Sequence, residues 1–110
     1  MTHATGLTER TRDFLRALAS ENRQQALLLF VDGQPRSVGQ IATDLGIGQS
    51  TASEQLAILR RGGLVRSKRD GKTVYYSADP DGILAAMNEL QTMLQTCCPP
   101  VRSEPGPPVQ

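Results

Sequence analysis

The sequence is poor in several residue types, and each scarcity excludes a class of structure. Its 110 residues include no Trp, two Phe and two Tyr, so the core of this single domain must be built mainly from aliphatic side chains. There is no run of about 18 apolar residues, which argues against a membrane span. The N-terminus lacks the basic and apolar segments of a secretory signal. We therefore expect a protein of the cytoplasm, without contact to a membrane.

Cysteine and histidine are also scarce. The two cysteines, Cys97 and Cys98, are adjacent and cannot form a disulfide framework, which favours a reducing compartment. The single histidine, His3, lies near the N-terminus, so no base is positioned for the cysteines. No phosphate-binding loop or paired-carboxylate spacing is present either. We therefore expect no enzyme. By composition, we expect disorder in residues 1–6, a folded domain over 7–98, and a disordered proline-rich tail over 99–110.

What the sequence does have is a concentrated basic strip. The net charge is only +1, but six of the twelve Lys and Arg residues lie between Arg60 and Lys72, against the single acid Asp70. A nearly neutral chain with one such strip is a better candidate for binding nucleic acid than its total charge suggests.

Residues 49–61 immediately precede and enter this strip and have the pattern of a recognition helix. Ala52, Leu56 and Leu59 recur at helical spacing, and residues 44–48 supply a helix stop and a glycine-bearing turn. The outline is that of a helix-turn-helix that reads the major groove of DNA. The alternative is an amphipathic helix with a merely solvated polar face. The polar residues expected to contact bases are Gln49, Ser50, Thr51, Ser53 and Glu54.

A β-hairpin is predicted directly after this helix. Two β-prone runs, 64–69 and 72–77, flank Asp70-Gly71, a strong hairpin signal. Cations at its tip indicate a wing that reaches phosphates or the minor groove. The alternative is a solvated hairpin whose lysines only discourage edge pairing. The residues expected to bind phosphate are Arg60, Arg61, Lys68, Arg69 and Lys72.

Three helices are expected before the recognition helix. The first spans about 7–19, with Leu7, Phe14, Leu15 and Leu18 as its apolar side. The second spans about 23–31 and is apolar all round, which predicts the central core helix, with a buried strand as the alternative. After a turn at 34–36, a capping box at Ser37–Gln40 begins a short third helix. Its inward-facing residues are Val38, Ile41, Ala42 and Leu45.

A long last helix begins at Asp79, which caps it, with Pro80 at its first position. It ends at Cys97-Cys98. Its apolar stripe is longer than a small core needs, so part of it is expected to pair with a second subunit; the alternative is burial in the core alone. The stripe consists of Ile83, Leu84, Met87, Leu90, Met93 and Leu94.

From about residue 15 to residue 94, the chain resembles the ArsR/SmtB family of winged-helix repressors. The resemblance is carried by residues 18–23, 41–46, 49–65 and 69–77. It implies a mainly α fold with a small β-hairpin, a winged helix-turn-helix of order ααααββα. It also implies a homodimer built on the first and last helices that binds two-fold operator DNA and is released by an effector. Two departures are Gly48, where the family usually has a capping serine, and Glu54-Gln55, where it often has a histidine.

Both common metal sites of that family are absent, because residues 38–42 hold no cysteine and the last helix holds no histidine. Some relatives place adjacent cysteines after the last helix to hold As(III) or Sb(III), and Cys97-Cys98 resembles that arrangement. Two thiolates are soft ligands suited to such ions, but the chain has no third cysteine. The alternatives for the pair are an inert helix end and a redox pair.

Two other functions stay open at the level of sequence. Met1-Thr2-His3 offers a free amine, two amides and an imidazole to Ni(II) or Cu(II), which makes His3 an alternative effector site unless Met1 is removed. The second is a regulator without a small-molecule effector, such as a developmental regulator or an antitoxin.

Overall fold

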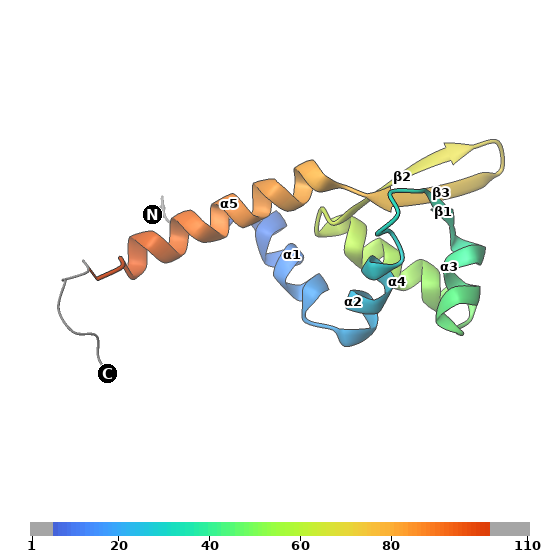
Figure 1. Ribbon diagram of the computed structural model, residues 1–110, viewed down its shortest axis with the longest axis horizontal. Coiled ribbons are helices and arrows are strands. Elements are labelled where there is room, and N and C mark those ends of the chain that lie inside the picture. Colours follow the sequence, from blue (N-terminus) through green and yellow to red (C-terminus); the bar gives the residue numbers. More distant parts are fainter. Residues whose placement is uncertain (1–5, 102–110) are drawn as a thin grey trace.

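The computed structural model describes residues 6–101 and has five helices and three short strands (Figure 1). The winged helix-turn-helix order predicted from the sequence is confirmed, with one additional strand before the third helix. In chain order the elements are α1 (Glu9–Leu18), α2 (Glu21–Leu28), β1 (Arg36–Ser37), α3 (Val38–Leu45), α4 (Gln49–Arg61), β2 (Val65–Asp70), β3 (Thr73–Ala78) and α5 (Pro80–Cys97).

The core is centred on α4. Ala52, Leu56 and Leu59 are completely buried, and α4 packs against α1, α2, α3 and β2. The helical spacing of these three residues places them on one side, so the other side is left to solvent. The rest of the buried cluster comes mainly from α1, α3 and the segment after α4, including Phe14, Ile41 and Leu64.

The prediction that the second helix is the central one is wrong. Within α2 only Ala26 is buried, while Leu28 and the following Val31 are exposed. The helix also ends at Leu28, three residues early, because the N–H groups of Leu29 and Phe30 bond to carbonyls three residues back and tighten the chain into a turn. Phe30 lies in that turn and is buried, so the apolar run of residues 26–31 contributes to the core from a turn as well as from the helix.

The sheet is antiparallel in the order β1-β3-β2. The predicted hairpin is confirmed, but its turn lies one residue later than expected: Asp70 pairs with Thr73, and the turn is Gly71-Lys72. Gly71 has a φ of +65°, which glycine adopts without strain. The predicted turn at 34–36 instead leads into β1, where Arg36 pairs with Tyr76 and Ser37 with Tyr75.

The capping box that starts α3 is confirmed. Ser37 Oγ accepts a bond from the N–H of Gln40 (3.2 Å), and Gln40 Oε1 accepts one from the N–H of Ser37 (2.8 Å). The inward face is also as predicted, with Ile41 and Ala42 buried. The first helix begins two residues later than expected, because Thr8 caps α1 and leaves Leu7 outside it.

Helix α5 begins as predicted, with Asp79 as its cap and Pro80 in its first turn, and it ends at Cys97. Ala86 is its only buried residue, and its C-terminal part extends away from the other helices (Figure 1). Residues 99–101 adopt neither helix nor strand. The rest of the two segments expected to be disordered lies outside the described residues. Among the helices of residues 6–101, none has the length and hydropathy that crossing a membrane requires.

Candidate nucleic-acid interface

The turn between α3 and α4 aims the start of α4 outward. Gly46 ends α3 with a φ of +69°, a left-handed conformation that favours glycine. The N–H of Ile47 then donates to the carbonyl of Ala42 (3.0 Å). Gly48 precedes α4 and provides no side-chain cap. The first turn of α4 therefore begins without the side-chain cap that a serine would have supplied there.

The residues predicted to read bases lie together on the exposed side of α4. All five are exposed, while Ala52 and Leu56 between and beyond them are buried. They come from the first two turns of the helix, at the end that lies beside α3. The five are Gln49, Ser50, Thr51, Ser53 and Glu54.

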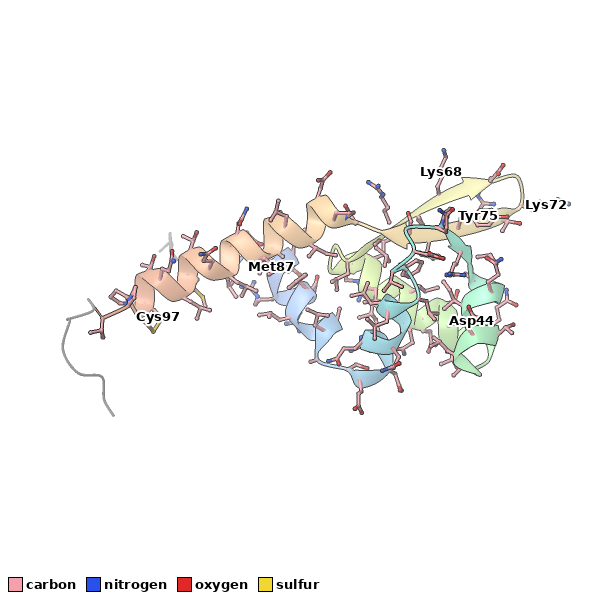
Figure 2. All side chains as sticks on the ribbon, in the orientation of Figure 1. Asp44, Lys68, Lys72, Tyr75, Met87 and Cys97 are labelled. Atoms are coloured by element: carbon pink, nitrogen blue, oxygen red, sulfur yellow. A yellow bond between two sulfur atoms is a disulfide. The ribbon has the colours of Figure 1, made fainter. Side chains whose placement is uncertain are left out.

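The hairpin separates the predicted phosphate ligands by face. Residues directly opposite in an antiparallel pair share a face, so Lys68 lies with Tyr75. Arg69 lies on the other face, which it shares with Tyr76, and Tyr76 packs against the core. Lys72 is at the turn. Figure 2 shows Lys68 directed away from the helices and Lys72 at the far tip of the hairpin.

Arg60 and Arg61 are exposed but lie at the opposite end of α4. Arg61 lies eleven positions after Ser50, which corresponds to about 16 Å along the helix axis. The end that carries them packs closely on α1: a Cβ at Gly62 would lie 2.8 Å from the carbonyl oxygen of Asp13. The structure thus brings the start of α4 and the hairpin tip to one end of the molecule, and leaves these two arginines at the α1 side (Figure 1).

A groove beside α4 was not predicted from the sequence. It has a volume of about 330 Å³ and lies between α2, α3 and α4. Of the residues that line it, only Thr51 was predicted to belong to the DNA-binding surface. The one hint in the sequence for any other lining residue is that Gln55 directly follows Glu54, a predicted base-reading residue. The lining residues are Asn22, Gln25, Asp44, Leu45, Ile47, Thr51 and Gln55.

The cysteine pair lies far from this surface. Cys97 and Cys98 are exposed and joined to each other by a disulfide, at the end of α5 remote from the hairpin (Figure 2). Cys98 also borders a hollow along α5 that is lined by Leu84, Met87 and Leu94. Within residues 6–101, no cluster of three or more His, Cys, Asp or Glu side chains is arranged to hold a metal ion. His3 lies outside the described residues.

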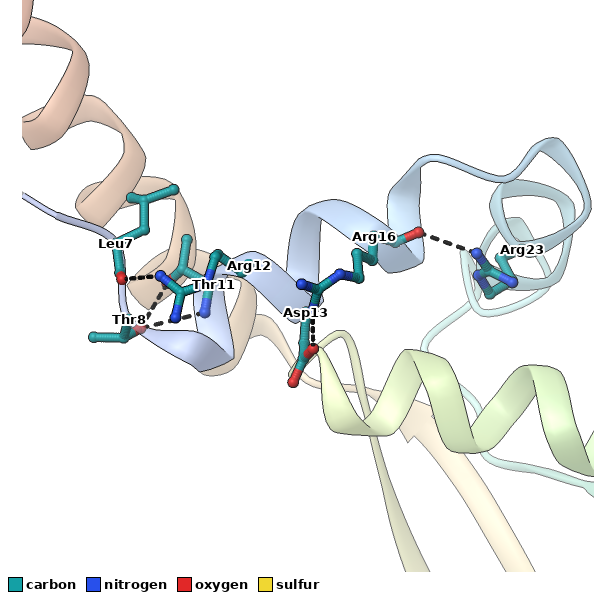
Figure 3. Close-up of polar contacts among 7 residues, drawn as sticks. All are labelled: Leu7, Thr8, Thr11, Arg12, Asp13, Arg16 and Arg23. Carbon is teal, nitrogen blue, oxygen red and sulfur yellow. Dashed lines mark hydrogen bonds and ion pairs between the residues drawn. The ribbon is translucent and has the colours of Figure 1, made fainter.

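The carboxylate of Glu89 on α5 is hydrogen-bonded to the start of α1. The Oε1 of Glu89 accepts a bond from the hydroxyl of Thr8 (2.9 Å), and Oε2 accepts one from the N–H of Thr8 (3.3 Å). The hydroxyl of Thr11, together with these bonds from Thr8, lowers the pKa of Glu89 by stabilising its charged form. Figure 3 shows Thr8 and Thr11 at the start of α1.

Comparison with known sequences identifies relatives of this arrangement. A family model described as "Bacterial regulatory protein, arsR family" matches residues 20–67. The transcriptional activator HlyU of Vibrio cholerae is 35% identical over 79 residues, 72% of each chain. A biofilm growth-associated repressor of Xylella fastidiosa is 32% identical over 84 residues, 76% of this chain and 73% of the repressor. The first is named as a transcriptional activator and the second as a repressor, and neither name describes an enzyme.

Solved structures agree with the sequence relatives. A structure of reduced HlyU superposes with a TM-score of 0.58 and 30% identity, covering 81% of this chain and 88% of that one. A homodimeric winged helix-turn-helix DNA-binding domain from Mycobacterium bovis, described as a possible ArsR-family regulator, superposes with a TM-score of 0.62 and 28% identity. It covers 82% of this chain and 90% of its own. The chain therefore belongs to the arsR family of bacterial regulatory proteins.

Proposed function

We propose that this transcriptional regulator is a homodimeric repressor. It binds two-fold symmetric operator DNA and leaves it when an effector acts on Cys97 and Cys98. The observation that carries the proposal is the division of the molecule into two ends. Exposed polar and cationic side chains gather at the start of α4 and on the hairpin, while α5 presents uncovered apolar side chains at the other end.

The apolar face of α5 supports the homodimer. Leu84, Met87 and Leu94 are each more than half exposed and line one continuous hollow, and Leu15 on α1 is also exposed. A contiguous exposed apolar patch is costly in water and marks an interaction site. The Mycobacterium bovis relative is described as a homodimer, so the proposed occupant is a second copy of this chain.

The start of α4 and the hairpin support DNA binding in two different ways, the first through contacts to bases and the second through contacts to phosphates. Short polar side chains in the first turns of a recognition helix reach base edges in the major groove. Lys68, Arg69 and Lys72 are proposed to contact phosphates without regard to sequence, and so are Arg60 and Arg61. The Mycobacterium bovis relative is described as a winged helix-turn-helix DNA-binding domain, which supports the same use of this surface.

Base reading is tested with a duplex that the wild-type protein selects from a random-sequence pool. Ser50→Ala or Ser53→Ala should weaken binding to that duplex by about 1–3 kcal/mol and leave binding to unselected DNA nearly unchanged. Equal losses on both duplexes would contradict base reading. In transcription from a promoter carrying the selected duplex, the bound protein should lower the transcript level, and a raised level would contradict repression.

Phosphate binding is tested by the salt dependence of the same affinity. Neutralising one contacting cation, as in Lys68→Gln or Lys72→Gln, should flatten the slope of log affinity against log salt by about one unit. Arg16→Gln is the matched control, because Arg16 is exposed on α1 and pairs with Asp13 (2.8 Å). An unchanged slope after replacement of Lys68, Arg69 and Lys72 together would remove the hairpin from the interface.

The effector proposal rests on the chemistry of two exposed, neighbouring sulfurs. Once the disulfide is reduced, two thiolates offer soft ligands to As(III) or Sb(III). A third ligand would come from water, a small thiol or the partner's cysteines. In the reduced protein bound to the selected duplex, arsenite or antimonite should release the DNA. The Cys97→Ser, Cys98→Ser variant should bind DNA normally and ignore both ions; release of this variant, or retention of the wild type, would contradict the proposal.

Oxidation is the second candidate signal, favoured by the disulfide itself and by the relative described in a reduced form. Two thiols of the pair would give two protons and two electrons to hydrogen peroxide, forming one S–S bond and two water molecules. Peroxide should then change the affinity of metal-free protein for the selected duplex, and a thiol reductant should restore it. Equal affinity of the reduced and oxidised forms would eliminate this signal.

A further inference from the structure

Arg23, in the first turn of α2, joins three helices through one side chain. Its Nε donates to the carbonyl of Ala17 (2.9 Å) and its Nη2 to the carbonyl of Arg16 (3.0 Å), both in the last turn of α1. Its Nη1 donates to Oε1 of Gln55 on α4 (3.1 Å). Figure 3 shows the bond from Arg23 to the carbonyl of Arg16.

The guanidinium group suits this role because its donors have fixed relative directions. The last carbonyls of a helix have no partner within the helix, so α1 presents acceptors at its end. A planar guanidinium carries five N–H donors in a rigid fork and can serve three acceptors at once. The end of α1 and the side chain of Gln55 are thereby held at one relative position, which a single ammonium group would not maintain.

Gln55 lies on the flank of the recognition helix, beside the proposed base-reading residues. It follows Glu54 directly, and it is one helical turn from Thr51, so the two share a side of α4. Both residues line the groove between α2 and α4. Gln55 bonds to Arg23, which is itself bonded to the end of α1, so this contact adds a polar constraint on the orientation of α4 to the burial of Leu56 and Leu59. The constraint acts on the flank of α4 that carries Thr51.

We propose that Arg23 is a positioning residue for DNA recognition. By bridging Gln55 and α1, which carries the exposed Leu15 of the proposed dimer face, it sets the angle between α1 and α4. That angle sets the separation of the two half-sites that a dimer reads. In a two-fold dimer any tilt of α4 occurs twice, while the half-sites of a bound duplex lie about 34–36 Å apart. The proposal rests on the proposed function, because it needs a dimer that binds a two-fold operator.

Three variants separate this role from general support of the fold. Arg23→Lys keeps the charge but loses the fork, and Gln55→Met removes the acceptor on α4 with little change in volume. Gln24→Met is the matched control: Gln24 Nε2 also caps α1, at the carbonyl of Leu18 (2.8 Å), but the described structure gives it no bond to α4. Circular dichroism and sedimentation establish that each variant is a folded dimer. If Arg23→Lys does not fold, Gln55→Met decides.

The readout is discrimination of half-site spacing. The probes are the duplex selected by the wild-type protein and two derivatives with one base pair inserted or removed at its centre. Wild type and Gln24→Met should bind the derivatives much more weakly than the selected duplex. Arg23→Lys and Gln55→Met should bind the selected duplex about tenfold more weakly, the equivalent of about 1.4 kcal/mol, and should distinguish the three spacings less. The salt slope should stay unchanged, since no phosphate contact is removed.

The outcomes are distinct. A double variant that loses no more than either single variant supports a shared bridge, whereas additive losses would mean that Gln55 contacts DNA by itself and would overturn the proposal. Variants that keep the wild-type spacing discrimination would also overturn it. A wild-type protein that selects no duplex at all would instead overturn the proposed function.

Discussion

Helices α4 and α5 carry similar apolar stripes in the sequence, yet the chain covers only one of them. In α4, Leu56 and Leu59 have no exposed surface, because α1, α2, α3 and β2 surround that face. In α5, Leu84 and Leu94 are 59% and 52% exposed, although Ile83 and Leu90 reach the core. Apolar residues at helical spacing therefore identify a helix and the side that will be buried. They do not show whether the same chain or a second subunit packs against that side.

The largest expected effect comes from breaking the covered stripe. Leu56→Ala should lower the free energy of unfolding by about 2–5 kcal/mol, since it removes buried methyl groups and leaves a cavity. Leu28→Ala is the matched control: Leu28 is 57% exposed, and its truncation should cost less than about 0.5 kcal/mol. Urea unfolding at one fixed protein concentration measures both. Similar costs for the two variants would contradict the central place of α4.

The next effect comes from the uncovered stripe. Leu84→Ala should weaken dimerisation by about 1.5–3 kcal/mol for each leucine that the interface buries. Sedimentation equilibrium measures the dissociation constant. Leu28→Ala again serves as the control, because Leu28 is as exposed as Leu84 but lies on α2. A dimer that is as tight in Leu84→Ala as in wild type would place the subunit contact elsewhere.

The contact between the start of α5 and the segment that follows α4 provides a third test. A Cβ at Gly82, in the first turn of α5, would collide with the backbone carbonyl of Gly63 behind α4, and backbone cannot move aside easily. Gly82→Ala should therefore destabilise the protein by about 1–3 kcal/mol despite alanine's better helix propensity.

Gly39→Ala in α3 is the control for that substitution. A Cβ there would meet nothing closer than the Ser37 hydroxyl at 3.9 Å. This variant should be stabilised by up to about 1 kcal/mol. Thermal unfolding of the pair checks the opposite signs, and a stabilised Gly82→Ala would show that α5 is not packed closely on the segment after α4.

The sequence predicted elements whose signals are local. The Ser37–Gln40 capping box, the turn at Gly46 and the hairpin around Gly71 each depend on neighbouring residues, and all three were found with shifts of at most one residue. Strand β1 was missed because two residues have no period of their own. Arg36 and Ser37 become a strand only by pairing with Tyr76 and Tyr75, which lie far along the chain.

The second helix was wrongly predicted to be the centre of the core for the same reason, because its burial depends on contacts with distant parts of the chain. Six consecutive apolar residues after Gln25 suggested a helix buried all round, but only tertiary packing decided that Leu28 and Val31 stay exposed. The bridge from Arg23 to Gln55 spans 32 residues and was likewise beyond any local pattern. Exposure of Ser50 and Glu54, in contrast, followed from their position opposite the stripe of Ala52, Leu56 and Leu59.

The smallest expected effect is at Glu89, where α5 meets the start of α1. Folding lowers the pKa of Glu89 through the Thr11 hydroxyl and the bonds from Thr8, so its charged form stabilises the folded state. That contribution is fully present above the pKa of an unfolded glutamate and is lost as the pH falls through the lowered value in the folded state. Glu89→Gln should therefore be slightly less stable than wild type at pH 7, and the difference should vanish in acid. The effect should be small because solvent screens this pair. Thermal unfolding across that pH range, repeated in a Thr8→Ala background, measures it. The difference should shrink without the Thr8 hydroxyl but persist in part, because the Thr11 hydroxyl and the Thr8 N–H still stabilise the carboxylate. A difference that does not depend on pH would contradict the assignment.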